Sequence, residues 1–161
     1  MTSPAIFIVE DEALIAMELE GRLEQLDYRV CGHVGSGEEA VSKVADIHPD
    51  LVLMDINLAG AMNGIEAAEQ IRQHYDIPVV FLSAFSHNDL LQQAAHAEPY
   101  GYLLKPFEER TLHATITMAL HRHQKERERT ELTRELQHIL FQIRDLCGAL
   151  PSQAVVRPPA V

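Results

Sequence analysis

Cysteine is scarce in this chain. Cys31 and Cys147 are the only two among 161 residues, and they lie far apart. Two distant cysteines exclude a disulfide framework and a metal motif built from paired cysteines. Because such chains are typical of reducing compartments, we expect a cytoplasmic location.

Basic side chains are also few. The chain has 13 lysines and arginines against 24 aspartates and glutamates, a formal net charge of -11. This balance excludes a protein held mainly by nucleic-acid phosphates, so we expect no nucleic-acid partner. No apolar run reaches the roughly 18 residues of a membrane span, and the amino terminus lacks the basic start of a secretory signal. We therefore expect neither a membrane partner nor secretion.

Charge is unevenly distributed along the chain. Residues 1–107 hold 5 basic and 17 acidic side chains, a net of -12, whereas residues 108–161 hold 8 and 7, a net of +1. With 47% hydrophobic residues, the chain has enough apolar residues for one core and an appendage. We predict a domain over 1–122, a helical extension over 123–150, and a disordered tail over 151–161, where three prolines exclude a stable helix.

Short apolar runs alternate with amphipathic stretches in the first 107 residues. Runs such as LVLM and VVFL lack polar alternation, which favours strands covered on both faces, as in a parallel sheet. Strands are predicted at 5–9, 28–34, 51–55, 78–83 and 101–104, and helices at 12–26, 37–47, 64–74 and 87–97. Five strand-then-helix units with right-handed crossovers predict a doubly wound α/β fold with a five-stranded parallel sheet.

Polar residues stand where these predicted strands end. Glu10 and Asp11 follow the first strand, Asp55 ends the third, Ser83 ends the fourth, and Lys105 follows the fifth. Ligands bind at the carboxyl ends of the strands in open α/β sheets, so these side chains are expected to converge. One carboxylate there would be read as a turn or cap residue. Three carboxylates with a hydroxyl and a lysine indicate a functional site.

Three carboxylates at one site need a compensating positive charge. At a separation of about 4 Å and an effective dielectric constant of about 20, each pair repels by roughly 4 kcal/mol. Mg²⁺ compensates such a cluster through oxygen ligands and commonly binds a phosphate at the same time. We therefore predict a magnesium site and phosphoryl chemistry, with Asp55 as the nucleophile and Lys105 and Ser83 stabilising charge on the phosphoryl oxygens.

Five segments resemble the receiver domain of two-component response regulators. They occur in the family's order and near its spacing, over about residues 4–122: VEDE (9–12), LVLMDINL (51–58), MNGIEA (62–67), VVFLSA (79–84) and YGYLLKPF (100–107). The resemblance implies a flavodoxin-like sheet of strand order 2-1-3-4-5. It also implies a phospho-accepting switch rather than an enzyme, with a sensor histidine kinase or phosphotransfer protein as the partner that supplies the phosphoryl group.

The resemblance also implies roles for the acidic residues. Asp55 corresponds to the phospho-accepting aspartate and Asp11 to a direct Mg²⁺ ligand. Glu10 takes the neighbouring acidic place, from which contact with the ion commonly runs through water. The backbone carbonyl of Asn57 corresponds to the third protein ligand.

The switch residues implied by the resemblance are Ser83, which supplies a hydroxyl, and Tyr102, which supplies an aromatic ring, beside the family's lysine, Lys105. From the residues alone, Tyr102 is better read as an aromatic half-buried on a strand. Its place three residues before Lys105 favours the switch role. The Lys105–Pro106 bond is expected to be cis by the same resemblance, and Phe85, like Asn57, takes a position that controls access of water to the phosphoryl group.

The loop after Asp55 departs from the family pattern. Gly64 follows Asp55 by nine residues where eight is common, and Ala59 stands where proline is usual. We therefore expect an altered geometry in this loop.

The region after Phe107 is predicted to be one long helix. From Glu108 to Leu150 there is no proline and only one glycine, so a helix of about 40 residues, roughly 60 Å long, is allowed. Its middle, HRHQKERERTE, is charged on all sides. Apolar residues then follow heptad spacing: Leu132, Leu136, Ile139, Ile143, Leu146 and Leu150. We predict a coiled-coil homodimer through 132–150, and the alternative is a helix that folds back on its own domain.

The favoured function is a response regulator that signals through altered protein–protein contacts, because no DNA-binding output domain is expected in this sequence. One alternative is a magnesium-dependent phosphatase with an aspartyl nucleophile. That fold has Asp-x-Asp near its first strand, whereas Asp55-Ile56-Asn57 follows the third predicted strand here. A second alternative is a receiver with an RNA-binding antitermination output, which needs a small helical bundle rather than one helix.

Overall fold

A computed structural model of the chain describes residues 2–84, 92 and 94–148. The chain separates into two compact units, residues 1–123 and 124–161. The predicted tail 151–161, Leu150, Phe85 and most of the predicted helix 87–97 lie outside the described residues.

Five parallel strands form one sheet in the order β2-β1-β3-β4-β5. The strand order and the α/β fold class are both confirmed. Each strand lies within one residue of its predicted bounds: β1 (Ala5–Val9), β2 (Arg29–Val34), β3 (Leu51–Asp55), β4 (Val79–Ser83) and β5 (Gly101–Leu104). Every residue of β1, β3 and β4 is buried, as expected for strands covered on both faces.

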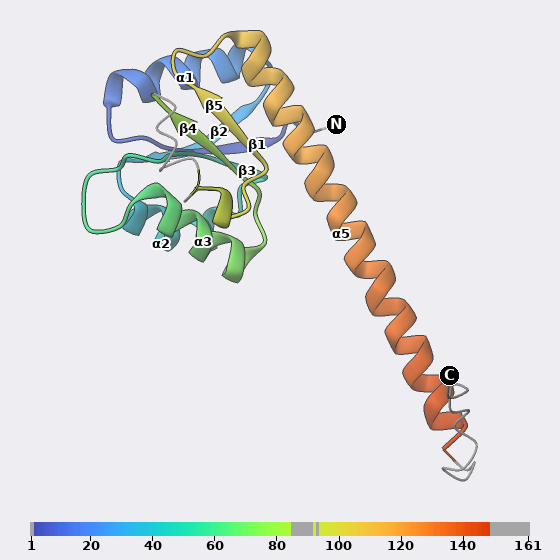
Figure 1. Cartoon of the computed structure of the whole chain (residues 1–161). Coiled ribbons are helices and arrows are strands. Elements are labelled where there is room, and N and C mark those ends of the chain that lie inside the picture. Colours follow the sequence, from blue (N-terminus) through green and yellow to red (C-terminus); the bar gives the residue numbers. More distant parts are fainter. Residues whose placement is uncertain (1, 85–91, 93, 149–161) are drawn as a thin grey trace. The chain divides into compact units, whose positions relative to one another are not determined.

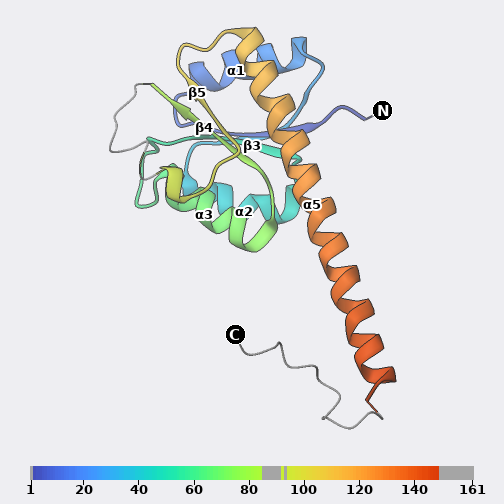
Figure 2. The same cartoon turned by 45° about the vertical axis from the view of Figure 1, so that its right-hand side comes forward.

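Helices cover both faces of this sheet. They are α1 (Ala13–Gln25), α2 (Gly37–Ile47), α3 (Gly64–Tyr75) and α5 (Glu109–Leu146). Figures 1 and 2 show α1 and the first turns of α5 on one face, with α2 and α3 on the other. Side-chain oxygens of Ser36 and Asn63 accept hydrogen bonds from the first turns of α2 and α3, which fixes where these helices begin.

Alternate residues of each central strand enter two separate apolar layers. Ile8 of β1 packs in a cluster with Leu19 of α1 and Leu112 of α5, whereas its neighbour Phe7 packs in a cluster with Ile71 of α3. All five side chains are fully buried. The two layers hold the sheet between its helices, and so they fix the positions of the strand ends.

The predicted long carboxyl-terminal helix is confirmed as α5, which has 38 residues. Its first turns contribute Leu112, Ile116 and Ala119 to the core of the first unit. Residues 124–148 of the second unit are helical up to Leu146. Among the residues that the structure describes, no helix is long and apolar enough to cross a membrane.

Candidate functional site

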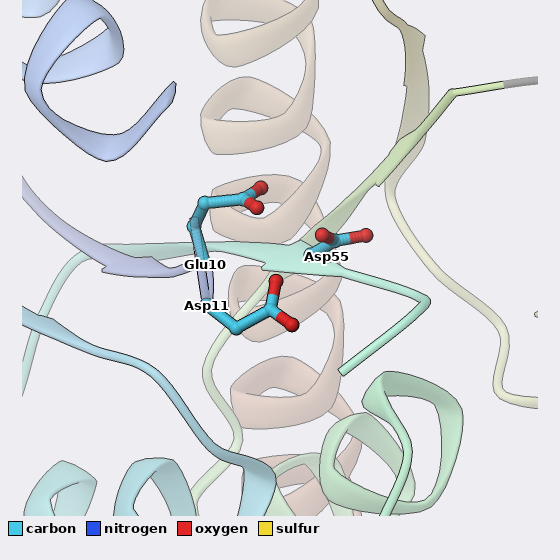
Figure 3. A group of neighbouring side chains, drawn as sticks. All are labelled: Glu10, Asp11 and Asp55. Atoms are coloured by element: carbon cyan, nitrogen blue, oxygen red, sulfur yellow. The ribbon is translucent and has the colours of Figure 1, made fainter. Parts of the chain in front are cut away.

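Three carboxylates meet at the carboxyl end of the sheet. Glu10 and Asp11 directly follow β1, and Asp55 is the last residue of the adjacent strand β3. Each offers one oxygen within 4.8 Å of the others. Figure 3 shows Glu10 and Asp11 on one chain segment beside Asp55 on the adjacent strand, with the three carboxylates close together. Glu10 and Asp55 are buried, whereas Asp11 is exposed, so the cluster has one open side.

Lys105 joins the two buried carboxylates. Its Nζ donates to Glu10 Oε2 at 2.7 Å and to Asp55 Oδ2 at 3.2 Å. The side chains of Lys105, Glu10 and Asp55 are 14%, 0% and 7% exposed. The backbone N–H of Lys105 also donates to the Ser83 carbonyl at 2.7 Å, and the Lys105–Pro106 bond is cis, as expected.

Burial and hydrogen bonding shift two pKa values at this site. Burial raises the pKa of Glu10 to about 7, and the negative charge of Asp55 adds to this effect, whereas the hydrogen bond from Lys105 opposes it. For Lys105, burial lowers the pKa, but its hydrogen bond to Glu10 and the two carboxylate charges outweigh burial and raise it. The lysine therefore stays charged at neutral pH, whereas Glu10 titrates there.

We expect replacement of Lys105 with methionine to destabilise the metal-free protein by about 2 to 3 kcal/mol at pH 8, because two buried carboxylates lose a charged donor. The loss should be smaller at pH 5.5. Without the lysine the pKa of Glu10 rises further, so the folded state takes up a proton at low pH and avoids the buried charge. Urea unfolding at both pH values measures the effect.

The matched control is Lys43→Met, which removes an exposed lysine of α2. This variant should change the free energy of unfolding by less than about 0.5 kcal/mol at either pH. Equal losses in the two variants, or a Lys105→Met loss that does not depend on pH, would contradict the assigned pairing.

The loop between β3 and α3 supports the Asp55 carboxylate. The backbone N–H of Asn57 donates to Asp55 Oδ1 at 3.0 Å, and the N–H of Gly64 donates to the Ile56 carbonyl at 3.1 Å. Within this loop, Gly60 has a positive φ of 112°. Such a conformation favours glycine.

Ser83 and Tyr102 lie on neighbouring strands but differ in exposure. Ser83 ends β4 and is 4% exposed, whereas Tyr102, in β5, is 39% exposed and its ring centroid lies 6.1 Å from that of Phe81. Tyr102 therefore contacts the sheet but keeps a large solvent-facing surface.

Two residues that the sequence analysis did not identify support the site from its periphery. His33 of β2 donates from Nε2 to the Glu10 carbonyl at 2.8 Å, and a Glu38 carboxylate oxygen of α2 accepts from the Met62 N–H at 2.8 Å. The first depends on the parallel pairing of β1 with β2, in which Ile8 lies opposite His33, and the sequence alone does not specify that register. The second joins residues 24 positions apart and has no local signal in the sequence.

The oxygen atoms of the cluster suit a hard divalent cation. Both Glu10 oxygens already accept hydrogen bonds, from Lys105 and from the Glu12 N–H, while the exposed Asp11 carboxylate faces the open side. Mg²⁺ takes one or two carboxylates and keeps several waters, so the residues present fit this ion. The arrangement can position a phosphoryl group between a carboxylate nucleophile and a lysine.

The sequence matches the response regulator receiver domain over residues 6–117. It is 42% identical to the transcriptional regulatory protein PdtaR of Mycobacterium tuberculosis over 118 residues, which are 73% of this chain and 57% of that protein. The phyllosphere-induced regulator PhyR of Methylorubrum extorquens is 35% identical over 77% of this chain and 46% of its own length. The chain thus spans about half the length of these curated relatives.

Solved structures agree with these sequence matches. The signal receiver domain of a modulated diguanylate cyclase from Desulfovibrio desulfuricans has a TM-score of 0.74 and 40% identity, covering 77% of this chain and 98% of that one. A receiver domain of a sensor histidine kinase from Pseudomonas aeruginosa, with a magnesium ion in its active-site cleft, has a TM-score of 0.67 and 27% identity, covering 73% and 98%.

Proposed function

Because the chain belongs to the response regulator receiver domain family, whose members are phospho-accepting switches, we propose that Asp55 accepts the phosphoryl group in this protein. The observation that carries the proposal is the hydrogen bond from Lys105 to Asp55 beside two further carboxylates. Receiver domains take their phosphoryl group from histidine kinases or phosphotransfer proteins, and the same class of donor is proposed here.

The proposed reaction is an in-line displacement at phosphorus. One Asp55 oxygen forms a P–O bond while the P–N bond to a donor imidazole breaks, and the electron pair of that bond leaves with the nitrogen. Asn57 and Lys105 hold the Asp55 carboxylate through separate oxygens, which orients it for attack. The charged Lys105 also stabilises negative charge on the transferred group.

Mg²⁺, when bound, would neutralise charge between the carboxylates and the phosphoryl oxygens. Asp11 and Asp55 are proposed as its carboxylate ligands, with the Asn57 backbone carbonyl as the third protein ligand. Glu10 is proposed to act through water, because both of its oxygens are already hydrogen-bonded.

We expect the affinity for Mg²⁺ to fall about tenfold between pH 8 and pH 6, because Glu10, with a pKa of about 7, is largely protonated at the lower pH. A raised pKa in the folded state also means that the stability contributed by this group in the metal-free protein is lost as pH rises from about 4.5 to about 7. Titration calorimetry in two buffers of different ionisation enthalpy would measure the affinity and the proton released.

Glu10→Gln is the control for this titration, since it keeps the side-chain size without the ionisable group. Its Mg²⁺ affinity should change little between pH 6 and pH 8. A tenfold pH dependence that persists in Glu10→Gln would assign the titration to another residue.

Ser83 and Tyr102 are proposed as the switch residues. Ser83 is buried at the end of β4, which pairs with the strand that Asp55 ends, so this residue lies at the edge where the phosphoryl group would be bound. Tyr102 has room to change its packing, because 39% of its surface is exposed. A phosphoryl group can shift this equilibrium only through different contact energies in the two states.

A small phosphodonor tests the proposed function. Acetyl phosphate with Mg²⁺ should add one phosphoryl group, seen by intact mass, and hydroxylamine should remove it because an acyl phosphate is labile to that nucleophile. Continuous turnover of a generic phosphomonoester would instead favour the phosphatase alternative, and an adduct that resists hydroxylamine would exclude a phosphorylated carboxylate.

A further inference from the structure

One face of α5 in the second unit carries an apolar stripe. An α-helix turns by about 100° per residue, which places six large apolar side chains within roughly 120° of one another. We define the apolar stripe by these six residues: Leu132, Leu136, Ile139, Leu140, Ile143 and Leu146. Their exposed fractions run from 49% for Ile139 to 83% for Leu146.

The stripe differs from the apolar residues in the first turns of the same helix. Leu112, Ile116 and Ala119 are fully buried, and they account for the packing of α5 in the first unit. Upstream of Leu132, the corresponding heptad positions are occupied by Lys125 and Arg129, both exposed. The stripe therefore begins at Leu132, and its residues are not among the members of the two core clusters.

The area of the stripe fits a helix–helix interface. At roughly 100 Å² of apolar surface for each large exposed side chain, the six residues offer about 600 Å² per copy. Two such surfaces together give about 1,200 Å², the lower limit for a specific protein–protein interface. A contiguous apolar surface of this size often marks an interaction site, whereas single apolar residues scattered over a surface do not.

Charge favours a second copy of the same helix as the occupant. Residues 124–148 hold five basic and five acidic side chains, so this segment has no net charge and does not repel itself. It also lacks the basic face that would favour anionic lipid or nucleic acid. Residues 1–123, in contrast, carry a net charge of -12, which opposes association through the receiver surface.

We propose that the apolar stripe pairs with the stripe of a second copy of this chain, as a two-helix coiled coil centred on Leu136, Ile139 and Ile143. Spacings of four, three, four and three residues from Leu132 to Leu146 match a heptad seam. Leu140 widens the seam on one side. The proposal does not depend on phosphorylation of Asp55.

Phe141 supplies a matched control within the same helix. It is an apolar side chain with 60% exposure, equal to that of Leu136, but it lies on the opposite side of the helix from the stripe. Glutamate at either position keeps a good helix former, so a difference between the two variants reports on the stripe rather than on helix stability.

The experiment compares the wild-type chain of 161 residues, the double variant Leu136→Glu/Ile143→Glu, and Phe141→Glu by sedimentation equilibrium at micromolar concentrations. Wild type and Phe141→Glu should both be dimers, whereas the double variant should be a monomer, with a dissociation constant raised at least about 100-fold. Circular dichroism and the acetyl phosphate adduct show on the same samples that the receiver remains folded and active.

A monomeric wild type, or a dimer that survives in the double variant, would overturn the proposal. Equal disruption by Phe141→Glu would also overturn it, since the effect would then not follow the stripe. A trimer or tetramer would overturn the two-copy arrangement. Loss of the phosphoryl adduct with the dimer intact would count against the proposed function and leave this inference standing.

Discussion

Replacing Asp55 with asparagine is expected to abolish the phosphoryl adduct formed from acetyl phosphate. The amide has nearly the shape of the carboxylate but lacks a nucleophilic anionic oxygen. Its carbonyl oxygen can still accept from the Asn57 N–H, which donates to Asp55 Oδ1 at 3.0 Å in the wild type, so the loop should keep its conformation. Intact-mass spectra of wild type and variant, with Mg²⁺ and with a chelator, measure the outcome.

The control for this variant is Asp46→Asn, which removes an exposed carboxylate of α2 away from the three-carboxylate cluster. It should form the adduct as the wild type does. An adduct that persists in Asp55→Asn, or one that forms equally well in the chelator, would show that another group accepts the phosphoryl moiety or that the acidic cluster needs no metal.

Strand positions and strand ends were the most predictable features of this fold. Fully apolar runs such as LVLM and VVFL have few alternatives to a strand covered on both faces, and β3 and β4 are buried along their whole length. Because parallel strands end at one edge, the pattern also predicts that Glu10 and Asp55 come together. The carboxylate oxygens within 4.8 Å of one another agree with that expectation.

Contacts between distant, polar side chains were not predictable. Glu38 lies on α2 and Met62 in the loop before α3, and the sequence around Glu38 looks like an ordinary acidic first turn of a helix. The contact of His33 was not predictable either, because an exposed histidine on an edge strand does not indicate a hydrogen bond to the Glu10 carbonyl. Such contacts depend on how helices and loops pack, which periodicity does not specify.

The exposure of Tyr102 could not be predicted from the sequence, for a related reason. An aromatic residue in a four-residue edge strand can pack under a helix or face solvent, and the local pattern GYLL is compatible with both. In the structure 39% of the Tyr102 surface is exposed, and its ring also contacts Phe81. Side-chain positions at the edge of a sheet are set by neighbours on only one side, so sequence constrains them less than positions in β3.

Adding a single methyl group at Gly64 is expected to destabilise the protein strongly. A Cβ placed on Gly64 would overlap the carbonyl oxygen of Asp55 and lie 3.0 Å from the Cα of Ile56. These are backbone atoms of a buried strand end, so no side chain can move aside to relieve the overlap. We expect Gly64→Ala to cost more than about 4 kcal/mol in the free energy of unfolding.

The same substitution should also slow phosphorylation in the fraction that remains folded, because relief of the overlap displaces the backbone that carries Asp55. Gly21→Ala is the matched control: Gly21 is an exposed residue inside α1, and an added Cβ meets nothing within 4 Å. Gly21→Ala should raise the free energy of unfolding by about 1 kcal/mol, because alanine has a higher helix propensity than glycine. Urea unfolding of both variants measures these effects. Similar free energies of unfolding would mean that the loop before α3 can shift at little cost, and that close backbone packing does not hold Asp55 in place.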